Sequence, residues 1–328
     1  MINYLDEMYD YAHDHRSLLS MMIELTTICN EKCVHCYIPE HTNIGLKTDD
    51  IKRVVKEFRE MGGLNLSLTG GEIFLRSDIY EIIEYARNLK LRVFLLTNGT
   101  LLGEKEIQLL KKYNIAELSI SVYSLDDTIH DSITGVKGSL KKTLQAVELA
   151  IQNGIRVTIK TPLMESNKWS FRDLKKYCKD RSIEYIASCI IFSKSNGDAN
   201  VKRLSINEND QRVIAREVEE IEPNGRRNNY EEACGSLKYT LAIDSFGNVY
   251  PCNSFFYKIG NIQNADITTL WNSKVLKSIQ NIKKIDLTDC KCCQLRNKCT
   301  RCPGLAYLED KTLLGCSSTA RKNVSMRL

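Results

Sequence analysis

Between residues 21 and 192, short apolar runs alternate with longer runs in which apolar residues recur every three or four positions. The short runs predict buried strands, and the longer runs predict amphipathic helices. The predicted strands cover residues 21–26, 64–72, 91–100, 116–124, 155–161 and 182–192. Because regular strand–helix alternation is typical of parallel sheets, the pattern predicts an α/β fold with a partial (β/α)6 TIM-like barrel.

The predicted helices cover residues 48–62, 77–89, 104–113, 138–154 and 170–180. Gly62 and Gly63 provide a stop signal for the first of these helices. Ser139 stands at the start of the fourth helix, where we expect its hydroxyl to cap the first turn.

Beyond the barrel the pattern changes twice. Residues 196–233 are polar, with one amphipathic run near the middle, which predicts a connector. A hairpin with its turn at 245–248 then opens a small cysteine-rich domain. The predicted divisions are an N-terminal extension at 1–20, the barrel at 21–195, the connector at 196–233 and the cysteine-rich domain at 234–328.

Charge and hydropathy exclude several function classes. The net charge is +5 over 328 residues, with acidic and basic residues interspersed, so we expect no nucleic-acid partner. No run approaches the roughly 18 apolar residues that a membrane span requires, and the acidic, aromatic start resembles neither a signal nor a transit peptide. We therefore expect a cytoplasmic protein with no membrane partner.

The chain has 13 cysteines, and in a reducing compartment grouped thiols indicate metal binding. Cys29, Cys33 and Cys36 directly follow the first predicted strand. Three thiolates on one loop suit an iron–sulfur cluster with one iron that has no protein ligand. A structural zinc site would need a fourth ligand, which no conveniently spaced residue supplies.

Other polar segments follow the second, third and fourth strands, at the carboxyl ends where active sites of such sheets lie. These segments are Thr69–Glu72, Thr97–Gly99 and Ser121–Ser124. "CNEKCVHCY" and "LTGGE" are similar to the two sequence motifs of the radical S-adenosylmethionine (SAM) superfamily, with His35 in the aromatic position of the cysteine loop. This resemblance covers residues 20–195 and agrees with the predicted barrel.

The resemblance implies a [4Fe–4S] cluster on the three cysteines, with SAM chelating the open iron. In that family, electron transfer from the reduced cluster cleaves SAM to methionine and a 5′-deoxyadenosyl radical, which abstracts hydrogen from the substrate. The residues that the resemblance assigns to cofactor binding are His35, Tyr37, Gly70, Gly71, Glu72, Thr97 and Ser121. The glycines and Glu72 would bind the methionyl amine, and Thr97 and Ser121 the ribose and carboxylate. Tyr123 is a further catalytic candidate. It replaces the Asp common in relatives, and Thr134 replaces their Arg.

Eight cysteines lie between residues 234 and 316. Zinc ribbons separate their cysteine pairs by about 15–20 residues, whereas five residues separate Cys293 from Cys299. The spacing instead resembles the SPASM domain, which carries two auxiliary [4Fe–4S] clusters, although the last pair is C-x2-C where C-x3-C is commoner. The implied ligands are Cys290, Cys293, Cys299 and Cys316 for the outer cluster and Cys234, Cys252 and Cys302 for the inner one.

The inner set is one ligand short. Either Cys292 supplies the fourth ligand or one iron is open, and we favour the open iron because Cys292 adjoins an outer ligand. With the cluster on the barrel loop, the chain would hold three [4Fe–4S] clusters.

SPASM enzymes mostly modify ribosomally made peptides, so the resemblance implies a peptide maturase that forms a thioether or carbon crosslink. About twenty residues precede the first strand, which leaves no room there for a leader-peptide-binding domain. Either a separate leader-binding protein or the barrel itself would then recognise the peptide. A flavodoxin- or ferredoxin-type reductant would supply electrons.

Two other activities stay open. In anaerobic sulfatase maturases an Asp follows the second SPASM cysteine, but Asn253 stands here, and an amide cannot take a proton at neutral pH. Dehydrogenation or epimerisation of a peptide or a small molecule, such as a sugar or haem precursor, is the other. Epimerisation would need a hydrogen-atom donor, for which Cys189 is a candidate, whereas Cys178 is expected to be a buried core residue. Candidate acids and bases are Tyr123, Asp126, Asp131, Lys160 and Glu165.

Overall fold

The computed structural model describes residues 4–218, 231–296, 299 and 301–326. Its centre is a curved sheet whose first six strands are parallel and run in the order β6-β5-β4-β3-β2-β1. These strands are β1 (Ser20–Glu24), β2 (Asn65–Thr69), β3 (Arg92–Thr97), β4 (Glu117–Ser121), β5 (Val157–Pro162) and β6 (Glu184–Ser188). The predicted six-stranded partial barrel is confirmed.

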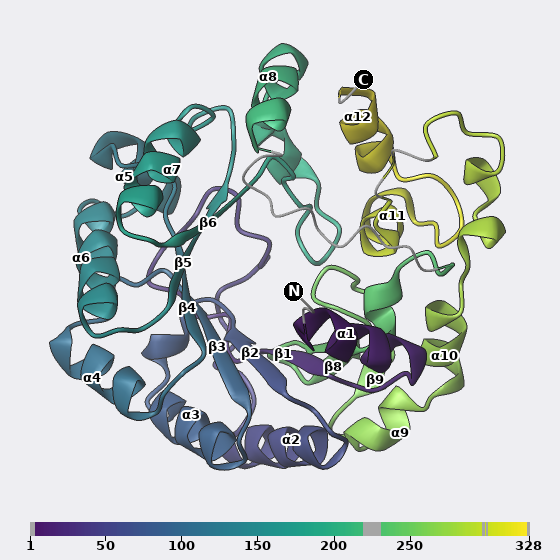
Figure 1. Ribbon diagram of the computed structural model, residues 1–328, viewed down its shortest axis with the longest axis horizontal. Coiled ribbons are helices and arrows are strands. Elements are labelled where there is room, and N and C mark those ends of the chain that lie inside the picture. Colours follow the sequence, from purple (N-terminus) through teal and green to yellow (C-terminus); the bar gives the residue numbers. More distant parts are fainter. Residues whose placement is uncertain (1–3, 219–230, 297–298, 300, 327–328) are drawn as a thin grey trace.

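Helices cover the outer side of this sheet (Figure 1). They are α2 (Thr48–Glu60), α3 (Ile79–Asn88), α4 (Glu104–Lys112), α5 (Asp127–Thr134), α6 (Ser139–Gln152) and α7 (Ser170–Asp180). Alternate strand residues face the helices, as Met21 and Ile23 of β1 do, and Phe58 of α2 lies fully buried in the same core. The opposite side of the strands is left to polar and partly exposed side chains, which places them on the inner side of the barrel.

Helix α2 ends at the predicted glycines. Gly62 takes a positive φ of 91°, and the amides of Gly62 and Gly63 donate to the carbonyls of Arg59 and Phe58. The predicted N-cap of α6 differs from the observed one, because the N-cap residue is Gly138 with a φ of 80°. Predicting Ser139 as the cap was therefore wrong.

The carboxylate of Asp131, on the preceding helix, takes the capping role instead. It accepts from the hydroxyl of Ser139 at 2.8 Å and from the amide of Leu140 at 3.1 Å.

The C-terminal region continues the same sheet. Strand β7 (Thr240–Ile243) pairs in parallel with β1, and β8 (Asn248–Tyr250) and β9 (Gly260–Asn261) follow antiparallel. The hairpin turn predicted at 245–248 is confirmed, but its attachment to the barrel was not predicted. The sheet therefore has nine strands among the described residues.

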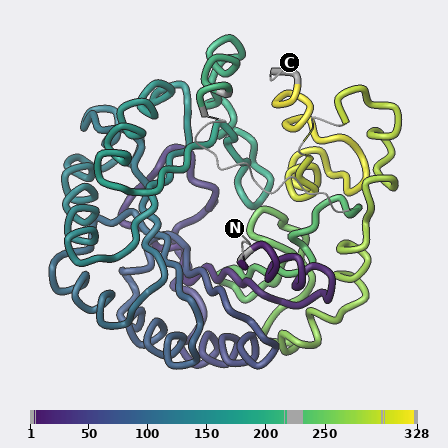
Figure 2. The backbone as a smooth tube through the Cα atoms, in the orientation of Figure 1, coloured from purple at the N-terminus to yellow at the C-terminus, as the bar shows by residue number. Residues whose placement is uncertain are grey.

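The remaining helices are α1 (Tyr4–Asp14), α8 (Glu208–Val218), α9 (Ile267–Trp271), α10 (Lys274–Gln280), α11 (Pro303–Asp310) and α12 (Ser318–Met326). Short 3-10 turns occur at Ile73–Leu75, Asn200–Leu204, Gly235–Lys238, Lys284–Asp286 and Thr288–Cys290. The amphipathic run predicted in the connector forms α8, and residues 219–230 of the connector lie outside the described residues. Helix α8 lies beside α12, where Gln211 donates to Asn323 at 3.4 Å (Figure 2).

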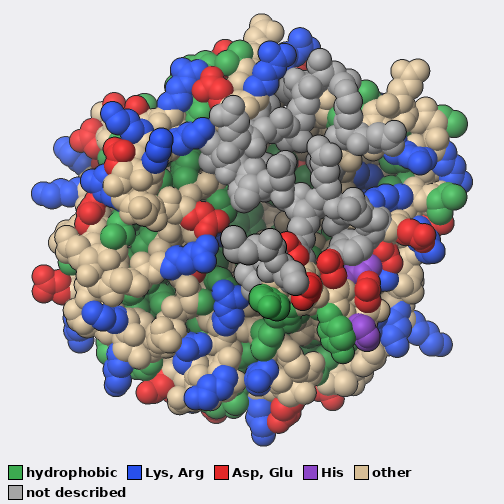
Figure 3. Space-filling view, viewed as in Figure 1, with side chains coloured by type: hydrophobic (Ala, Val, Ile, Leu, Met, Phe, Trp, Pro, Cys, Tyr) green, Lys and Arg blue, Asp and Glu red, His purple; other side chains and the backbone are tan. Residues whose placement is uncertain are grey.

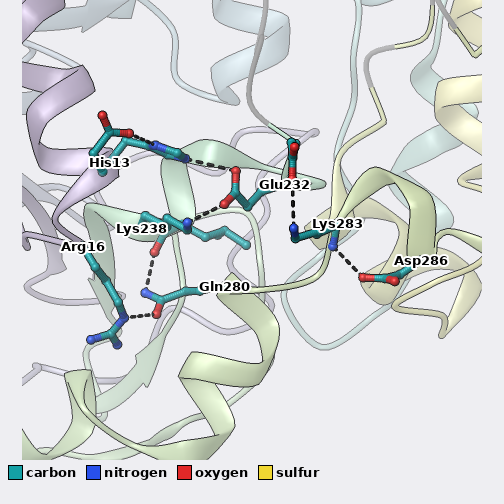
Figure 4. A network of polar contacts seen from close by, with 10 residues as sticks. His13, Arg16, Glu232, Lys238, Gln280, Lys283 and Asp286 are labelled. Carbon is teal, nitrogen blue, oxygen red and sulfur yellow. Dashed lines mark hydrogen bonds and ion pairs between the residues drawn. The ribbon is translucent and has the colours of Figure 1, made fainter.

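The N-terminal residues join the C-terminal region through a polar network (Figure 4). The imidazole of His13 lies 3.2 Å from the carboxylate of Glu232, which also pairs with Lys238. Arg16 donates to the side chain of Gln280 at 2.5 Å and stacks over the ring of Trp271 at 4.5 Å. Residues 1–20, predicted as an extension of the barrel, thus fasten the barrel to the cysteine-rich region in their described part.

Helix length and surface charge bear on the predictions about membrane and nucleic-acid partners. In the described ranges, no helix combines the length and apolarity needed to traverse a lipid bilayer. On the face drawn in Figure 3, lysine and arginine side chains are mixed with aspartate and glutamate over the barrel rather than gathered into one patch.

Candidate functional site

The loop that carries the first three cysteines is fastened to the end of β2. The amides of Gly71 and Glu72 donate to the carbonyls of Thr26 and Ile28, both at 2.8 Å. A Cβ at Gly70 would lie 2.4 Å from the carbonyl oxygen of Thr26, and one at Gly71 would lie 2.2 Å from that of Ile28. The two glycines are therefore required because they let the backbones of the two loops touch.

Glu72 is fully buried, and its carboxylate is hydrogen-bonded to groups of the protein itself. It accepts hydrogen bonds from the hydroxyl of Thr97 at 2.8 Å, the amide of Asn98 at 2.9 Å and the amide of Phe74 at 3.0 Å. Burial raises the pKa of Glu72, and these donors oppose that rise. Glu72 thus ties the Gly70–Glu72 segment to the end of β3, and its assignment to the methionyl amine stays a prediction.

Thr97 is occupied in the same way. Its hydroxyl donates to Glu72 and accepts from the amide of Gly99 at 3.0 Å. Thr97 thus joins the ends of β2 and β3, and its assignment to the ribose or carboxylate of SAM stays a prediction.

The three thiols of the loop are half-buried. Burial raises the pKa of Cys29 to about 11 and that of Cys33 further, and the charge of Cys36 adds to both rises. The sulfur of Cys33 lies 3.4 Å from the carboxylate of Glu31. Thiols in such surroundings stay protonated unless a metal stabilises the thiolates, so metal binding here would release protons.

The loop also contains buried polar atoms with no hydrogen-bond partner. Oε1 of Glu31 and Nδ1 of His35 are two of them, and buried polar groups in native proteins nearly always have a partner, which can be a water, an ion or a ligand. Among the described side chains, no three from His, Cys, Asp and Glu are arranged to bind one metal ion. The donor set of the loop is three thiols, which suits a cluster with several irons, each reached by a separate thiolate, better than a four-coordinate zinc ion.

Three predicted residues gather around Cys33. The phenol of Tyr123 donates to the sulfur of Cys33 at 3.7 Å, and its ring meets His35 edge-on with centroids 5.0 Å apart. Ser121 hydrogen-bonds with the same phenol. Burial and the neighbouring thiolate raise the pKa of Tyr123 well above its usual value, so this phenol stays protonated and can donate.

Tyr37 points elsewhere. Its hydroxyl donates to Glu24 of β1 at 2.8 Å, and Glu24 also accepts from Ser245 of the hairpin turn at 3.1 Å. The ring of Tyr37 lies 6.5 Å from that of Phe256, four residues after Cys252. Tyr37 thus connects the cysteine loop to the C-terminal region, and its assignment to cofactor binding stays a prediction.

Most of the predicted acids and bases have structural partners. Asp126 caps α5, Asp131 caps α6, and Glu165 pairs with Lys168. Lys160 lies beside Ser121 on the inner side of the barrel, where burial lowers its pKa. Tyr123 and Lys160 are therefore the candidates that face the site.

The two isolated cysteines belong to the core. Cys178 is 1% exposed, and Cys189 contacts the core between the sheet and the helices. Cys189 is partly buried and directly follows β6, and its assignment as a hydrogen-atom donor stays a prediction.

The inner set of C-terminal cysteines lies near a group of aromatic rings. Burial raises the pKa of Cys252, and the charges of Cys234 and Cys302 add to the rise. Cys234 and Cys252 pack against a small core that includes Phe255, and Tyr257 and Tyr307 pack against the same core. Gly304 lets the backbone at the start of α11 lie close to that of Ser254, because a Cβ at residue 304 would lie 2.3 Å from the carbonyl oxygen of Ser254.

The outer cysteines Cys290, Cys293, Cys299 and Cys316 also lie together. Burial raises the pKa of Cys290 and Cys299, and the charges of the other outer thiols contribute to both rises. Cys292 is exposed, and the charges that act on Cys252 come from Cys234 and Cys302. The extra thiol is thus placed with the outer loop rather than with the inner set.

Three residues near the thiols had no predicted role. Asn98 donates to Asn30 at 2.8 Å and lies 4.0 Å from the sulfur of Cys29. Glu31 contacts Cys33, as described above, and Arg301 lies between the two C-terminal thiol sets. Asn98 could have been found from its place at the end of the third strand. For Glu31 and Arg301, the only feature of the sequence that indicates a place in the site is their position among the cysteines.

Comparisons with known proteins agree with these arrangements. A model of the radical SAM superfamily matches residues 23–178, and a model of the SPASM iron–sulfur cluster-binding domain matches residues 234–303. The chain is 28% identical over 324 residues to the antilisterial bacteriocin subtilosin biosynthesis protein AlbA of Bacillus subtilis, covering 93% of this chain and 70% of that protein. It is 25% identical over 317 residues to an AdoMet-dependent heme synthase of Methanosarcina barkeri, covering 87% of this chain and 90% of that protein.

Among solved structures, Streptococcus suis SuiB bound to its precursor peptide SuiA has the same fold. The TM-score is 0.74 at 17% identity, over 96% of this chain and 79% of that chain. With two matching domain families, a cysteine loop fitted to an iron–sulfur cluster and this fold, the chain belongs to the radical SAM superfamily of enzymes and carries a C-terminal SPASM domain.

Proposed function

We propose that this enzyme crosslinks a ribosomally made peptide, through either a thioether or a carbon–carbon bond. The observation that carries the proposal is the contact between the two thiol-bearing regions. Strand β7 pairs with β1, and Tyr37 of the cysteine loop meets Phe256 beside Cys252. A peptide held against both regions would have its reacting carbon near the first thiol set and its other side chain near the inner one.

The similarity to AlbA, which is named for subtilosin biosynthesis, supports a peptide substrate because it extends over most of both chains. The SuiB structure with its precursor peptide supports a fold that can accommodate one. Recruitment of the peptide by a separate leader-binding protein and reduction by a flavodoxin or ferredoxin are parts of the same proposal. So is a cytoplasmic location, where thiols stay reduced.

In this proposal Cys29, Cys33 and Cys36 hold one [4Fe–4S] cluster, and the C-terminal thiols hold two more. When bound, SAM with a reduced cluster supplies hydrogen-atom abstraction from an unactivated C–H bond, and the auxiliary clusters supply an acceptor for a further electron. Crosslinking removes two hydrogen atoms from the peptide in total, which is why an acceptor is needed in addition to SAM.

The chain's own residues prepare the site. The Gly70–Glu72 segment fixes the cysteine loop and offers backbone groups to SAM, while Ser121 and Lys160 line the adjoining strands. Tyr123 covers Cys33 and donates to its sulfur, which keeps water from that thiolate. The inner cluster is proposed to have an open iron, because Cys292 is exposed in the outer loop.

A second candidate function is oxidation of a small molecule such as a haem precursor. It is favoured by the Methanosarcina barkeri heme synthase, whose match covers nearly all of both chains. Sulfatase maturation is not favoured, because Asn253 is exposed and its amide cannot serve as a base.

The test uses the full chain after anaerobic reconstitution, with SAM and dithionite. Peptides made from the short reading frames beside its gene are the first substrates, and an iron-free tetrapyrrole haem precursor is the second. We expect one peptide to lose two hydrogens by mass spectrometry, with 5′-deoxyadenosine formed in proportion. Oxidation of the tetrapyrrole with every peptide unchanged would contradict the proposal.

Cys29→Ala is the negative control, because it removes one thiolate of the loop, and both products should then fall to background. The matched control is Cys292→Ala, which removes an exposed thiol and should retain activity.

A further inference from the structure

Arg301 connects the two C-terminal thiol sets. Its backbone precedes Cys302 of the inner set, and Cys299 of the outer set is two residues earlier. Its guanidinium extends to the outer set, where Nε donates to the carbonyl of Gly315 at 2.8 Å and Nη2 donates to that of Leu313 at 2.7 Å. Because Gly315 precedes Cys316, two hydrogen bonds hold this cation between the sets.

The remaining nitrogen of the guanidinium has no partner. Nη1 of Arg301 is buried and makes no hydrogen bond within the part of the chain that the structure describes. A buried, charged N–H group without an acceptor costs free energy comparable with a lost charge-assisted hydrogen bond. The outer thiols and Cys302 act on this cation electrostatically, and their charges oppose the lowering of its pKa that burial causes. Sulfur acceptors are therefore the chemistry that its surroundings offer.

Arg301 lies within the short C-x2-C pair, directly before Cys302. Its side chain is partly buried. Among the described carboxylates, no ion pair with Arg301 occurs within 4.0 Å. The cation is thus available to the groups that the thiols bind.

We propose that Arg301 is a positioning residue that raises the reduction potentials of the two auxiliary clusters. The proposal rests on the cluster assignment of the proposed function. Each one-electron reduction adds one negative charge to a buried cluster, and a fixed cation nearby stabilises the reduced form. Electrons from the flavodoxin- or ferredoxin-type reductant or from the substrate would then remain on these clusters more readily.

The test is an anaerobic redox titration followed by electron paramagnetic resonance. It uses the reconstituted full chain in which Cys29, Cys33 and Cys36 are all replaced by Ala, so that auxiliary clusters alone give the signal. Arg301→Gln in this background removes the charge and keeps an amide donor. We expect the ratio of reduced to oxidised cluster at a fixed potential to fall at least tenfold, which is 59 mV for a one-electron couple.

Arg296→Gln is the matched control, because Arg296 is an exposed arginine of the same loop. It should leave the ratio within twofold of the parent. Equal ratios in Arg301→Gln and the parent, with iron content unchanged, would overturn the inference. An iron content near zero in the parent would instead contradict the cluster assignment, which distinguishes the two failures.

Arg301→Lys covers the case in which Arg301→Gln loses its iron. Retained iron and a ratio near that of the parent in the lysine variant would support an electrostatic role. Loss of iron from the lysine variant as well would overturn it, because a purely structural role of the two carbonyl hydrogen bonds would then account for both variants.

Discussion

The barrel and the cysteine-rich region hold their thiols by different means. In the barrel, the cysteine loop is fastened by β2 and backed by the large core between the sheet and the helices. In the C-terminal region, the described residues between α10 and α11 form only two short 3-10 turns, and Ile285 is 70% exposed. The first site is formed by protein packing, whereas the outer site of the second has little packing to support it.

This difference implies that the two regions depend to different degrees on bound metal for their stability. Small cores rarely stabilise a fold without crosslinks or metals, so we expect cluster binding by the outer thiols to contribute directly to folding. We expect the sheet of the barrel to fold without a cluster, because its core is large.

The largest expected effect is the separation of SAM cleavage from product formation. Cys302→Ala removes a thiol of the inner set and leaves the barrel loop intact, so cleavage of SAM should continue while crosslinked product falls at least 100-fold, about 3 kcal/mol in transition-state stabilisation. Both products are measured in one reaction by chromatography and mass spectrometry. An unchanged yield of crosslinked peptide would mean that the inner set has no part in the reaction.

Metal removal should affect the two regions unequally. After chelation of iron, we expect amide hydrogen exchange in residues 281–316 to become fast, while the amides of β1 to β4 keep their protection because the barrel core is unchanged. The measurement is hydrogen exchange by mass spectrometry on the loaded and the iron-free chain. Equal loss of protection in both regions would show that the barrel also depends on its metal.

The N-terminal helix offers a test of how the two regions are joined. Arg16→Met removes the hydrogen bond to Gln280 and leaves that buried amide without its donor. Local opening of α1 and α10 should become easier by about 3 kcal/mol, the cost of a buried hydrogen bond to a charged group. Hydrogen exchange of these helices measures it, with the exposed Lys105→Met as control. Protection equal to wild type would contradict a joining role for this network.

The smallest effect concerns pH. Burial lowers the pKa of His130 to about 4, and Nε2 of this buried side chain has no hydrogen-bond partner. The unfolded chain takes up the proton near the ordinary pKa of about 6.5, whereas the folded chain does so only near 4, so stability is lost as the pH falls between these values. From pH 7 to pH 5 the loss is about 2 kcal/mol.

His130→Asn should remove this part of the pH dependence and retain an acceptor for the amide of Tyr123. Urea unfolding at the two pH values measures it, and His15→Asn, an exposed histidine, should keep the wild-type dependence. Identical pH dependence in wild type and His130→Asn would contradict the assignment.

The barrel could be predicted because its signals are local. Strand and helix periodicities, and the glycine stop after α2, depend on residues within one or two turns of each other. The pairing of β7 with β1 joins Ser20 to Thr240, and no local pattern encodes it. Ser139 was assigned the wrong role for the same reason, because the carboxylate that caps α6 comes from Asp131 on another helix.

The site shows the same limit. The cysteines and the Gly70–Gly71 pair were found because their spacing is a feature of the sequence itself. The hydrogen bond of Thr97 to Glu72 joins the ends of two different strands. The orientation of the Arg301 guanidinium depends on a backbone carbonyl twelve residues away. Hydrogen-bond partners of this kind follow from the fold and cannot be read from spacing.

The most direct test of the account is the iron and sulfide content per chain after anaerobic reconstitution, with wild type beside the Cys29/Cys33/Cys36 triple alanine variant. Three [4Fe–4S] clusters predict about twelve irons in wild type and about eight in the variant. About four irons in wild type and none in the variant would contradict it, because the C-terminal thiols would then hold no cluster.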